Sequence, residues 1–537
     1  RDLNLAVTPA HASDLSTLAV LPFENVGDDE ENEVLASGLH MDLQDQLGRL
    51  SALRVTSPMS VREYEATEKG DQEIATELGV DYLLRGSVRR SGNQARIFVQ
   101  LVDAGTSENL WTDQFDREVT AETLFDIQSD IARQVAGQLA AELSPSDLAV
   151  LDAEPPSDDL AAIAAYNRAR QVYFEGSQGE IPDAVEFAER ATELDPGFVD
   201  AWAFLTRLRS LQAWRGEGGV DAARDALLKT ESLAPGSVQA ITARGFYTYY
   251  VDQEFDAALE QLREAERLAP SDVDVITGIA YLQRRLGRWE QALGTIRRAV
   301  SVSPRSPDLL TEYAVMLGET GRHTASDAVA ERALQVDPSI PFVRSWKVRT
   351  TLARSRDIGR ARGLAAELGL DASEPTEANV LYMLAMYEGN LDAAARIADG
   401  IPASEQLGSE MNRLFRRGWA RTLGGRNAGA IGDSVLALDW SPTGTHGWQQ
   451  LAEALGRTFT GDEDGAWTAM EEAIRLARVS DDAATSVVIR ANVALLTASM
   501  GRTVESLDLL AEIVETPGNF IDAVYLLYSP AFDLSLI

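Results

Sequence analysis

The residue types that most often perform catalysis or bind metals are few and scattered in this chain. There is no cysteine, which excludes disulfides, thiolate nucleophiles and Cys-ligated metal sites. The four histidines lie far apart in the sequence and share no ligand spacing such as HExxH; they are His11, His40, His323 and His446. We therefore predict no metal site and no catalytic histidine.

Motifs for phosphate binding and acyl transfer are also missing. The chain contains neither the GxxxxGK phosphate loop nor the GxSxG nucleophile elbow. The glycine-rich stretch GEGGVDAARD (216–225) falls between two expected helices and follows no strand, so it lacks the context of a phosphate-binding loop. We predict that this chain is not an enzyme, has no catalytic residues and binds no cofactor.

Four arginines stand close together in a chain that has 48 basic and 84 acidic residues; they are Arg85, Arg89, Arg90 and Arg96. Three interpretations are open: the solvated face of a sheet, ion pairing or docking with the rest of the chain, and contact with nucleic acid. Alternation with apolar residues favours the first. A net charge of −36 repels a phosphate backbone, so we predict no nucleic-acid partner.

The elements around these arginines form an α/β pattern. Period-two alternation on both sides of the turn SGN (91–93) predicts a hairpin. The remaining expected elements are strands at 17–23, 53–57 and 109–118 and helices at 33–50, 71–79 and 123–143. The predicted order is β-α-β-α-β-β-β-α, an α/β domain of about five strands and three helices.

After residue 160 the pattern changes to helices that end in matching proline phrases. The prolines are Pro196, Pro235, Pro270, Pro304 and Pro338, at intervals of 39, 35, 34 and 34 residues. A 34-residue period of paired helices is the signature of tetratricopeptide (TPR) repeats. Small residues such as Ala292 and Ala299 fall where the two helices of a repeat must approach closely. The period loosens after residue 340, and we count nine or ten helical pairs.

The sequence therefore predicts a mainly α protein in which an N-terminal α/β domain precedes an all-α TPR superhelical solenoid. No stretch approaches 18 apolar residues, so we expect no membrane insertion by this chain. The expected layout is a leader (1–16), the α/β domain (17–143), a linker (144–160), the solenoid (161–528) and a C-terminal tail (529–537).

Six residues are our candidates for partner binding on the solenoid. TPR arrays bind partners on the concave surface lined by the first helix of each pair, and aromatic and arginine side chains are the usual interface anchors. Projecting the repeat frame places the candidates on this surface at non-core positions, although a one-residue shift of frame would place them in the core; they are Phe246, Tyr249, Tyr281, Arg284, Phe415 and Trp419. The predicted partner is a protein or peptide.

The first 143 residues resemble the TolB amino-terminal-like domain found in many bacterial regulators. The resemblance rests on three segments in the right order: LAVLPFENVGDDEENEVLASGLHMDLQDQL, LGVDYLLRGSVRRSGNQARIFVQLVDAGTSENLWTDQFDRE and LFDIQSDIARQVAGQL. The loop at 26–29 is more acidic than the usual NLSGDP, which leaves any role of that loop open. In such proteins the domain often lies between a transmembrane helix and a TPR array.

This resemblance implies a non-catalytic sensor and interaction region of a membrane-anchored bacterial regulator. The output module, a class III adenylate cyclase or a winged-helix domain, would lie upstream, so any cyclase activity would belong to a segment outside this chain. The implied location is periplasmic, with the cytoplasm as the alternative. Two other hypotheses remain: an envelope TPR scaffold without signalling output, and the soluble part of an adenylate cyclase whose catalytic domain lies upstream.

Overall fold

The structure is a computed structural model that describes residues 16–514 and 516. Gaps fall at 28–29, 49, 51–52, 57, 62–63, 66, 68, 140–142, 145–146, 149–150, 153–154, 176–180, 271, 404–406, 439–446, 481 and 515. All of the expected leader except its last residue, Ser16, and the whole expected tail (529–537) lie outside the described residues. The chain divides into two compact units: 1–201 with 266–273 and 302–304, and the remaining residues from Trp202 onward.

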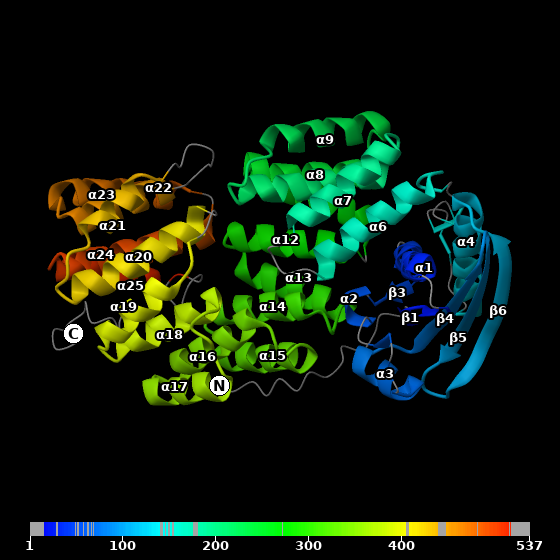
Figure 1. The fold of residues 1–537 in the computed structure, drawn as a ribbon, viewed down its shortest axis with the longest axis horizontal. Helices are drawn as coiled ribbons and strands as arrows, with labels where there is room; N and C mark the ends of the chain where they lie inside the picture. Colours follow the sequence, from blue (N-terminus) through cyan, green and yellow to red (C-terminus); the bar gives the residue numbers. More distant parts are fainter. Residues whose placement is uncertain are drawn as a thin grey trace. The chain divides into compact units, whose positions relative to one another are not determined.

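The first unit contains a six-stranded sheet and the helices that cover it (Figure 1). The strands are β1 (Ser16–Val20), β2 (Glu24–Asn25), β3 (Leu53–Val55), β4 (Tyr82–Ser91), β5 (Gln94–Asp103) and β6 (Glu108–Glu118). The helices are α1 (Glu30–Gly48), α2 (Pro58–Val61), α3 (Asp71–Leu78) and α4 (Ala121–Gln138). The sequence predicted all but two of these elements, the two-residue β2 and the four-residue α2.

The sheet has the strand order β3-β1-β4-β5-β6, with β2 also paired to β4. Strand β1 pairs in parallel with β3 and β4, and β2 pairs in parallel with β4. Strands β4, β5 and β6 form an antiparallel meander. Helices α1 and α4 cover one face through a core that includes Leu43, Leu84 and Ile131. Helix α3 covers part of the other face, where Leu83 and Ile74 are fully buried.

The predicted arginine-rich hairpin is confirmed, with Ser91 opposite Gln94 across the turn. Three of its arginines bond inside this domain. Arg85 pairs with Asp71 of α3, Arg90 Nε donates to the carbonyl of Gly92 at 2.9 Å, and Arg96 Nε donates to Asp116 Oδ1 at 2.6 Å. These contacts agree with the interpretation as a sheet face that is partly solvated and partly covered by α3.

Twenty helices, α6 to α25, follow in the described part of the chain. They are α6 (Leu160–Glu175), α7 (Ile181–Leu194), α8 (Val199–Trp214), α9 (Val220–Leu233), α10 (Val238–Tyr247), α11 (Phe255–Leu268), α12 (Val273–Arg285), α13 (Trp289–Val302), α14 (Pro307–Glu319), α15 (His323–Val336), α16 (Pro341–Ser355), α17 (Ile358–Glu367), α18 (Pro375–Tyr387), α19 (Leu391–Gly400), α20 (Leu407–Leu423), α21 (Gly429–Leu436), α22 (Trp448–Thr460), α23 (Glu463–Val479), α24 (Ala483–Ser499) and α25 (Thr503–Val514). The predicted fold class, mainly α with an N-terminal α/β domain and a TPR-type array, is confirmed.

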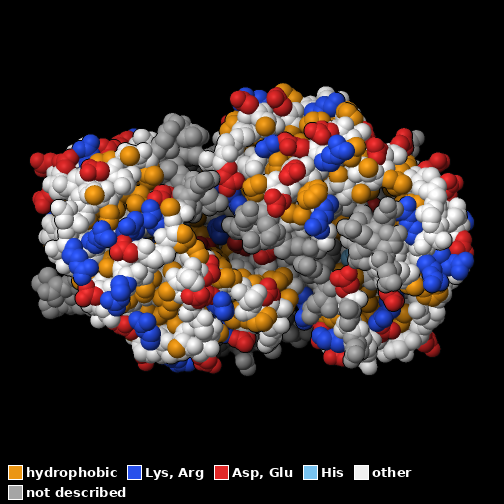
Figure 2. All heavy atoms as spheres, in the orientation of Figure 1, with side chains coloured by type: hydrophobic (Ala, Val, Ile, Leu, Met, Phe, Trp, Pro, Cys, Tyr) orange, Lys and Arg blue, Asp and Glu red, His pale blue; other side chains and the backbone are white. Residues whose placement is uncertain are grey.

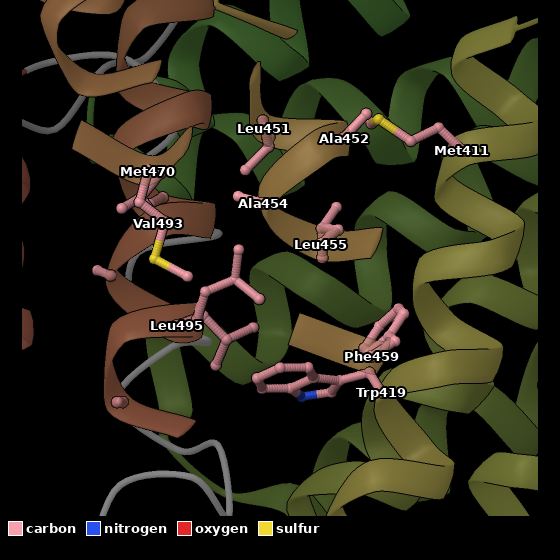
Figure 3. Packing of buried hydrophobic residues seen from close by; sticks show 14 of the residues in the cluster. Met411, Trp419, Leu451, Ala452, Ala454, Leu455, Phe459, Met470, Val493 and Leu495 are labelled. Carbon is pink, nitrogen blue, oxygen red and sulfur yellow. The ribbon is translucent and has the colours of Figure 1, made fainter. Parts of the chain in front are cut away.

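Small residues fill the positions where helices approach, as the repeat pattern predicts. Ala292, Ala299 and Ala330 are fully buried. Gly287 and Gly321 adopt positive φ angles of 68° and 74° at the turns inside their pairs, a conformation that glycine adopts without steric cost. Near the C-terminal end of the array, helices α20, α22, α23 and α24 enclose Trp419, Phe459, Met470 and other apolar side chains (Figure 3).

One repeat departs from the helical geometry of the others. The chain between Pro235 and Pro270 is 35 residues long, one more than the following repeats. Helix α10 continues into a π-helical turn, η2 (Thr248–Asp252). A π-helical turn accommodates one inserted residue within an α-helix and often lies at a functional site. The inserted residue therefore changes which side chains of this repeat face its core.

Candidate partner-binding surface

Two arginines on first helices of the pairs form ion pairs with carboxylates on other first helices. Arg207 of α8 lies 2.7 Å from Asp274 of α12, and its guanidinium is 4.5 Å from the ring centroid of Phe246 on α10. Only 13% of the Arg207 side-chain surface is exposed. This arginine therefore ties three first helices together and covers the Phe246 ring.

A second arginine, Arg284 of α12, lies between two carboxylates of α14. Its Nη1 is 3.6 Å from Glu312 and 3.8 Å from Glu319, and its guanidinium is 5.5 Å from the Tyr281 ring centroid. We call these four residues the Arg284 cluster. Burial by itself lowers the pKa of Arg284, but the charges of Glu319 and Glu312 outweigh it and the pKa lies above its ordinary value. The guanidinium is therefore charged at every physiological pH.

The Arg284 cluster is not saturated internally. The Nε of Arg284 and the Oε2 of Glu312 are buried, and neither has a hydrogen-bond partner within the described ranges. The distances from the guanidinium to both carboxylates exceed hydrogen-bond length. An unsatisfied buried donor or acceptor costs about 1–3 kcal/mol, so the cluster is under-satisfied as it stands.

Arg285, the next residue on α12, contacts aromatic residues and the far end of the array. Its guanidinium is 4.9 Å from the Trp214 ring centroid, and Trp214 in turn lies 5.9 Å from Tyr249. Its Nη1 donates to Asp482 Oδ2 at 2.7 Å and to Thr485 Oγ1 at 3.1 Å. Burial opposes the charge of Arg285, but Tyr249 and Asp482 outweigh it and the pKa is raised.

The structure brings four of the six candidate residues together and corrects the placement of three. Phe246 and Tyr249 belong to one core with which Tyr281 packs, beside Arg284. The prediction that Phe246, Tyr249 and Trp419 lie outside the core is wrong, because they are only 2%, 3% and 2% exposed. The π-helical turn places Tyr249 in the core, where its ring stacks on that of Tyr250 with 4.4 Å between the ring centroids. Partner binding by Tyr281 and Arg284 stays a prediction.

The other two candidates lie on α20, away from the Arg284 cluster in sequence. Trp419 is buried, Phe415 is partly buried, and their rings stack at 5.7 Å. Trp419 is held in the core formed by α20, α22 and α24 (Figure 3). Phe415 packs against the same core, so its part in partner binding also stays a prediction.

Sequence reasoning missed the arginines that surround these two aromatic residues. Arg413, Arg417 and Arg421 recur at intervals of four along α20, and we call them the α20 arginine stripe. The segment RLFRRGWARTLGGR (413–426), which has five arginines and no acidic residue, was the available signal.

The α20 arginine stripe has two internal partners. Arg413 Nε donates to Glu410 Oε2 at 2.7 Å. Arg417 Nε and Arg421 Nη2 both donate to Asp399 of α19, at 2.9 Å and 3.1 Å. Burial by itself raises the pKa of Asp399, but hydrogen bonds from both arginines outweigh it and the pKa lies below its ordinary value. One carboxylate is thus shared by two permanent cations.

The described residues offer neither a metal site nor a membrane-spanning helix. Within them, no group of three or more His, Asp or Glu side chains is arranged to hold a metal ion. No described helix is both long enough and apolar enough to cross a membrane.

Comparison with known proteins gives the α/β domain a family match. Residues 13–134 match the family described as the second domain of HilA/YgeH-like transcriptional regulators. The resemblance to TolB amino-terminal-like domains is not confirmed by this match. A curated relative, putative adenylate cyclase 3 of Rhizobium meliloti (strain 1021), is 30% identical over 194 residues. The alignment covers 35% of this chain and about a third (32%) of the relative's length.

Solved structures that resemble the chain include TPR proteins, with low similarity overall. A tetratricopeptide repeat protein from Parabacteroides merdae ATCC 43184 has a TM-score of 0.34 at 16% identity and covers 48% of this chain and 98% of its own. Pseudomonas aeruginosa pilF has a TM-score of 0.30 at 18% identity, and the match covers 37% of this chain and 90% of pilF. The APC/C hetero-tetramer Cut9-Hcn1 has a TM-score of 0.41 at 14% identity, covering 73% and 74%.

Proposed function

We propose that this chain is the non-catalytic, partner-sensing region of a bacterial regulator. Its TPR-type array would bind a protein or peptide on the face formed by the first helices of the pairs. The α/β domain would pass the bound state to an output module encoded upstream.

The observation that carries the interaction proposal is the unsaturated Arg284 cluster. Tyr281 and Arg284 are partly exposed on a first helix, and the charge of Arg284 is held between two carboxylates. Arginine and tyrosine are enriched among residues that dominate interface energies. The Arg284 side chain keeps 17% of its surface exposed, and from this surface it would donate hydrogen bonds to the backbone or side chains of a bound peptide.

The names found by comparison support the regulator half of the proposal. One describes a domain of transcriptional regulators and the other a putative adenylate cyclase. The transcriptional-regulator match lies on the α/β domain, and two different output chemistries are named for the two similar proteins. Both names belong to kinds of protein that act in regulation, which supports a regulatory role for this chain.

A random peptide library displayed on phage tests the interaction. We expect the wild-type chain to enrich peptides, and we expect Tyr281→Ala/Arg284→Gln to bind the enriched peptides at least about tenfold more weakly. Arg297→Gln is the matched control, because Arg297 is exposed on the second helix α13. Failure to enrich any peptide, or equal binding by all three proteins, contradicts the proposed binding face.

The gene sequence upstream of the codon for Arg1 tests the regulator half separately. A transmembrane helix preceded by a cyclase or winged-helix domain supports a membrane-anchored regulator with this chain in the periplasm. A bare signal peptide or lipoprotein signal would instead indicate an envelope scaffold without an output module.

A further inference from the structure

The α20 arginine stripe is a local reversal of charge in a chain whose net charge is −36. Figure 2 shows Lys and Arg side chains gathered on the face over α19 and α20, at the left of the view. The side chains of Arg417 and Arg421 keep 27% and 32% of their surface exposed. Arg417 and Arg421 are therefore accessible on the first helix of their pair, whereas the Arg413 side chain is only 13% exposed.

The three arginines of the stripe bond two carboxylates of the described structure, Glu410 and Asp399. Like charges four residues apart destabilise a helix by about 0.2–0.5 kcal/mol per pair. Arg413 has its own carboxylate in Glu410, but Arg417 and Arg421 share Asp399. A guanidinium can hold a carboxylate in a bidentate geometry, and two guanidinium groups can do so for two carboxylates. The two arginines thus have capacity for a further carboxylate.

We propose that Arg417 and Arg421 bind an acidic peptide segment, rich in Asp and Glu, of a partner protein. The inference rests on the proposed function, since it assumes that the array binds peptides, and it adds a second surface and the chemistry of the ligand. It does not depend on the Arg284 cluster.

Charge complementarity favours a short peptide over a nucleic acid. The fields of exposed charges are screened beyond about 8–10 Å at physiological ionic strength. A short acidic segment can therefore respond to the stripe alone. A long polyanion would extend onto the acidic remainder of the surface, which repels it.

A direct binding measurement tests the proposal. The probe is a fluorescein-labelled peptide of alternating Asp and Glu, about eight residues long, which exceeds the span of about 12 Å from Arg413 to Arg421 along the helix. Fluorescence anisotropy should show binding to the full chain that weakens between about 50 mM and 300 mM salt. A Ser-Gln peptide of the same length should not bind.

Two variants and a matched control separate a binding role from a structural one. Arg417→Gln/Arg421→Gln should weaken peptide binding at least about tenfold. Arg263→Gln/Arg475→Gln removes the same charge from exposed arginines that pair with Glu260 and Glu472 on their own helices, and it should bind like wild type. Asp399→Asn, which removes the internal competitor, should tighten binding.

The Asp399 variant keeps the test decisive if the double variant fails to fold. Unchanged or weaker binding by Asp399→Asn, or equal loss in the matched control, overturns the proposal. Tighter binding of a single-stranded oligonucleotide than of the peptide would assign the stripe to nucleic acid, and stripe-dependent self-association in sedimentation would assign it to a second copy. Either result also overturns it. The phage library could also enrich peptides that are not acidic and whose binding does not change in the Arg417→Gln/Arg421→Gln variant. That result would support the proposed function and contradict this inference.

Discussion

At the scale of single residues, His323 links the stability of the array to pH. This histidine is the first residue of α15, at the position where the repeat pattern expects an aromatic ring. Burial, and then the charge of Arg354, lower its pKa in the folded protein. Because the folded pKa lies below the unfolded value of about 6.5, the neutral ring favours folding. The stabilisation that this group contributes is fully present above about pH 6.5, and it is lost as the pH falls through the folded pKa.

NMR titration of the imidazole should therefore give a midpoint for His323 below that of a free histidine. Arg354→Gln should raise the midpoint, because it removes the neighbouring positive charge. The free energy of unfolding should fall between about pH 7 and pH 5.5, the range in which histidine titrates, and His323→Phe should remove the share of this loss that His323 causes. A midpoint at or above the free value would show that neither burial nor Arg354 controls this ring.

At the scale of elements, helices α21 and α22 approach so closely that only glycine fits between them. A Cβ atom on Gly432 would lie 2.6 Å from the backbone oxygen of Gly456, which cannot move without separating the helices. We expect Gly432→Ala to destabilise this pair by about 1–3 kcal/mol. Gly294→Ala on α13 is the control, because its Cβ would meet nothing within 4 Å and alanine favours helix by up to about 1 kcal/mol.

Hydrogen exchange measured by mass spectrometry distinguishes the two glycine variants. Gly432→Ala should accelerate exchange in α21 and α22, whereas Gly294→Ala should leave exchange in α13 unchanged or slower. Equal effects of the two substitutions would show that the contact with Gly456 is not limiting.

The elements also show how far the sequence can predict this protein. Period-two and 34-residue patterns are local, and they predicted the hairpin, the α/β order and the paired helices. The π-helical turn at Thr248–Asp252 was not predicted, although the 35-residue interval marked it, and so Tyr249 was assigned to the wrong side of its helix. The sharing of Asp399 by Arg417 and Arg421 depends on how α19 packs against α20, and the repeat period does not determine that.

At the scale of the whole molecule, the second unit contains a contact between residues almost 200 positions apart. Arg285 at the end of α12 pairs with Asp482, which is the N-cap of α24 and only 2% exposed on its side chain. Close packing accompanies the pair, since a Cβ on Gly287 would lie 3.2 Å from that of Ala483. No periodic pattern predicts such a contact, because it joins two repeats that are not neighbours.

Asp482→Asn isolates the contribution of this ion pair to stability. Asparagine caps a helix about as well as aspartate, so α24 keeps its N-cap while Arg285 loses its buried counter-charge. Removing one partner of a buried pair costs about 3–5 kcal/mol. Hydrogen exchange should therefore accelerate in both α12 and α24. The control is Asp462→Asn, because Asp462 is an exposed N-cap paired with Arg457, and a surface pair contributes about 0–1 kcal/mol. If exchange accelerates in α24 while α12 is unchanged, the pair does not couple these two repeats.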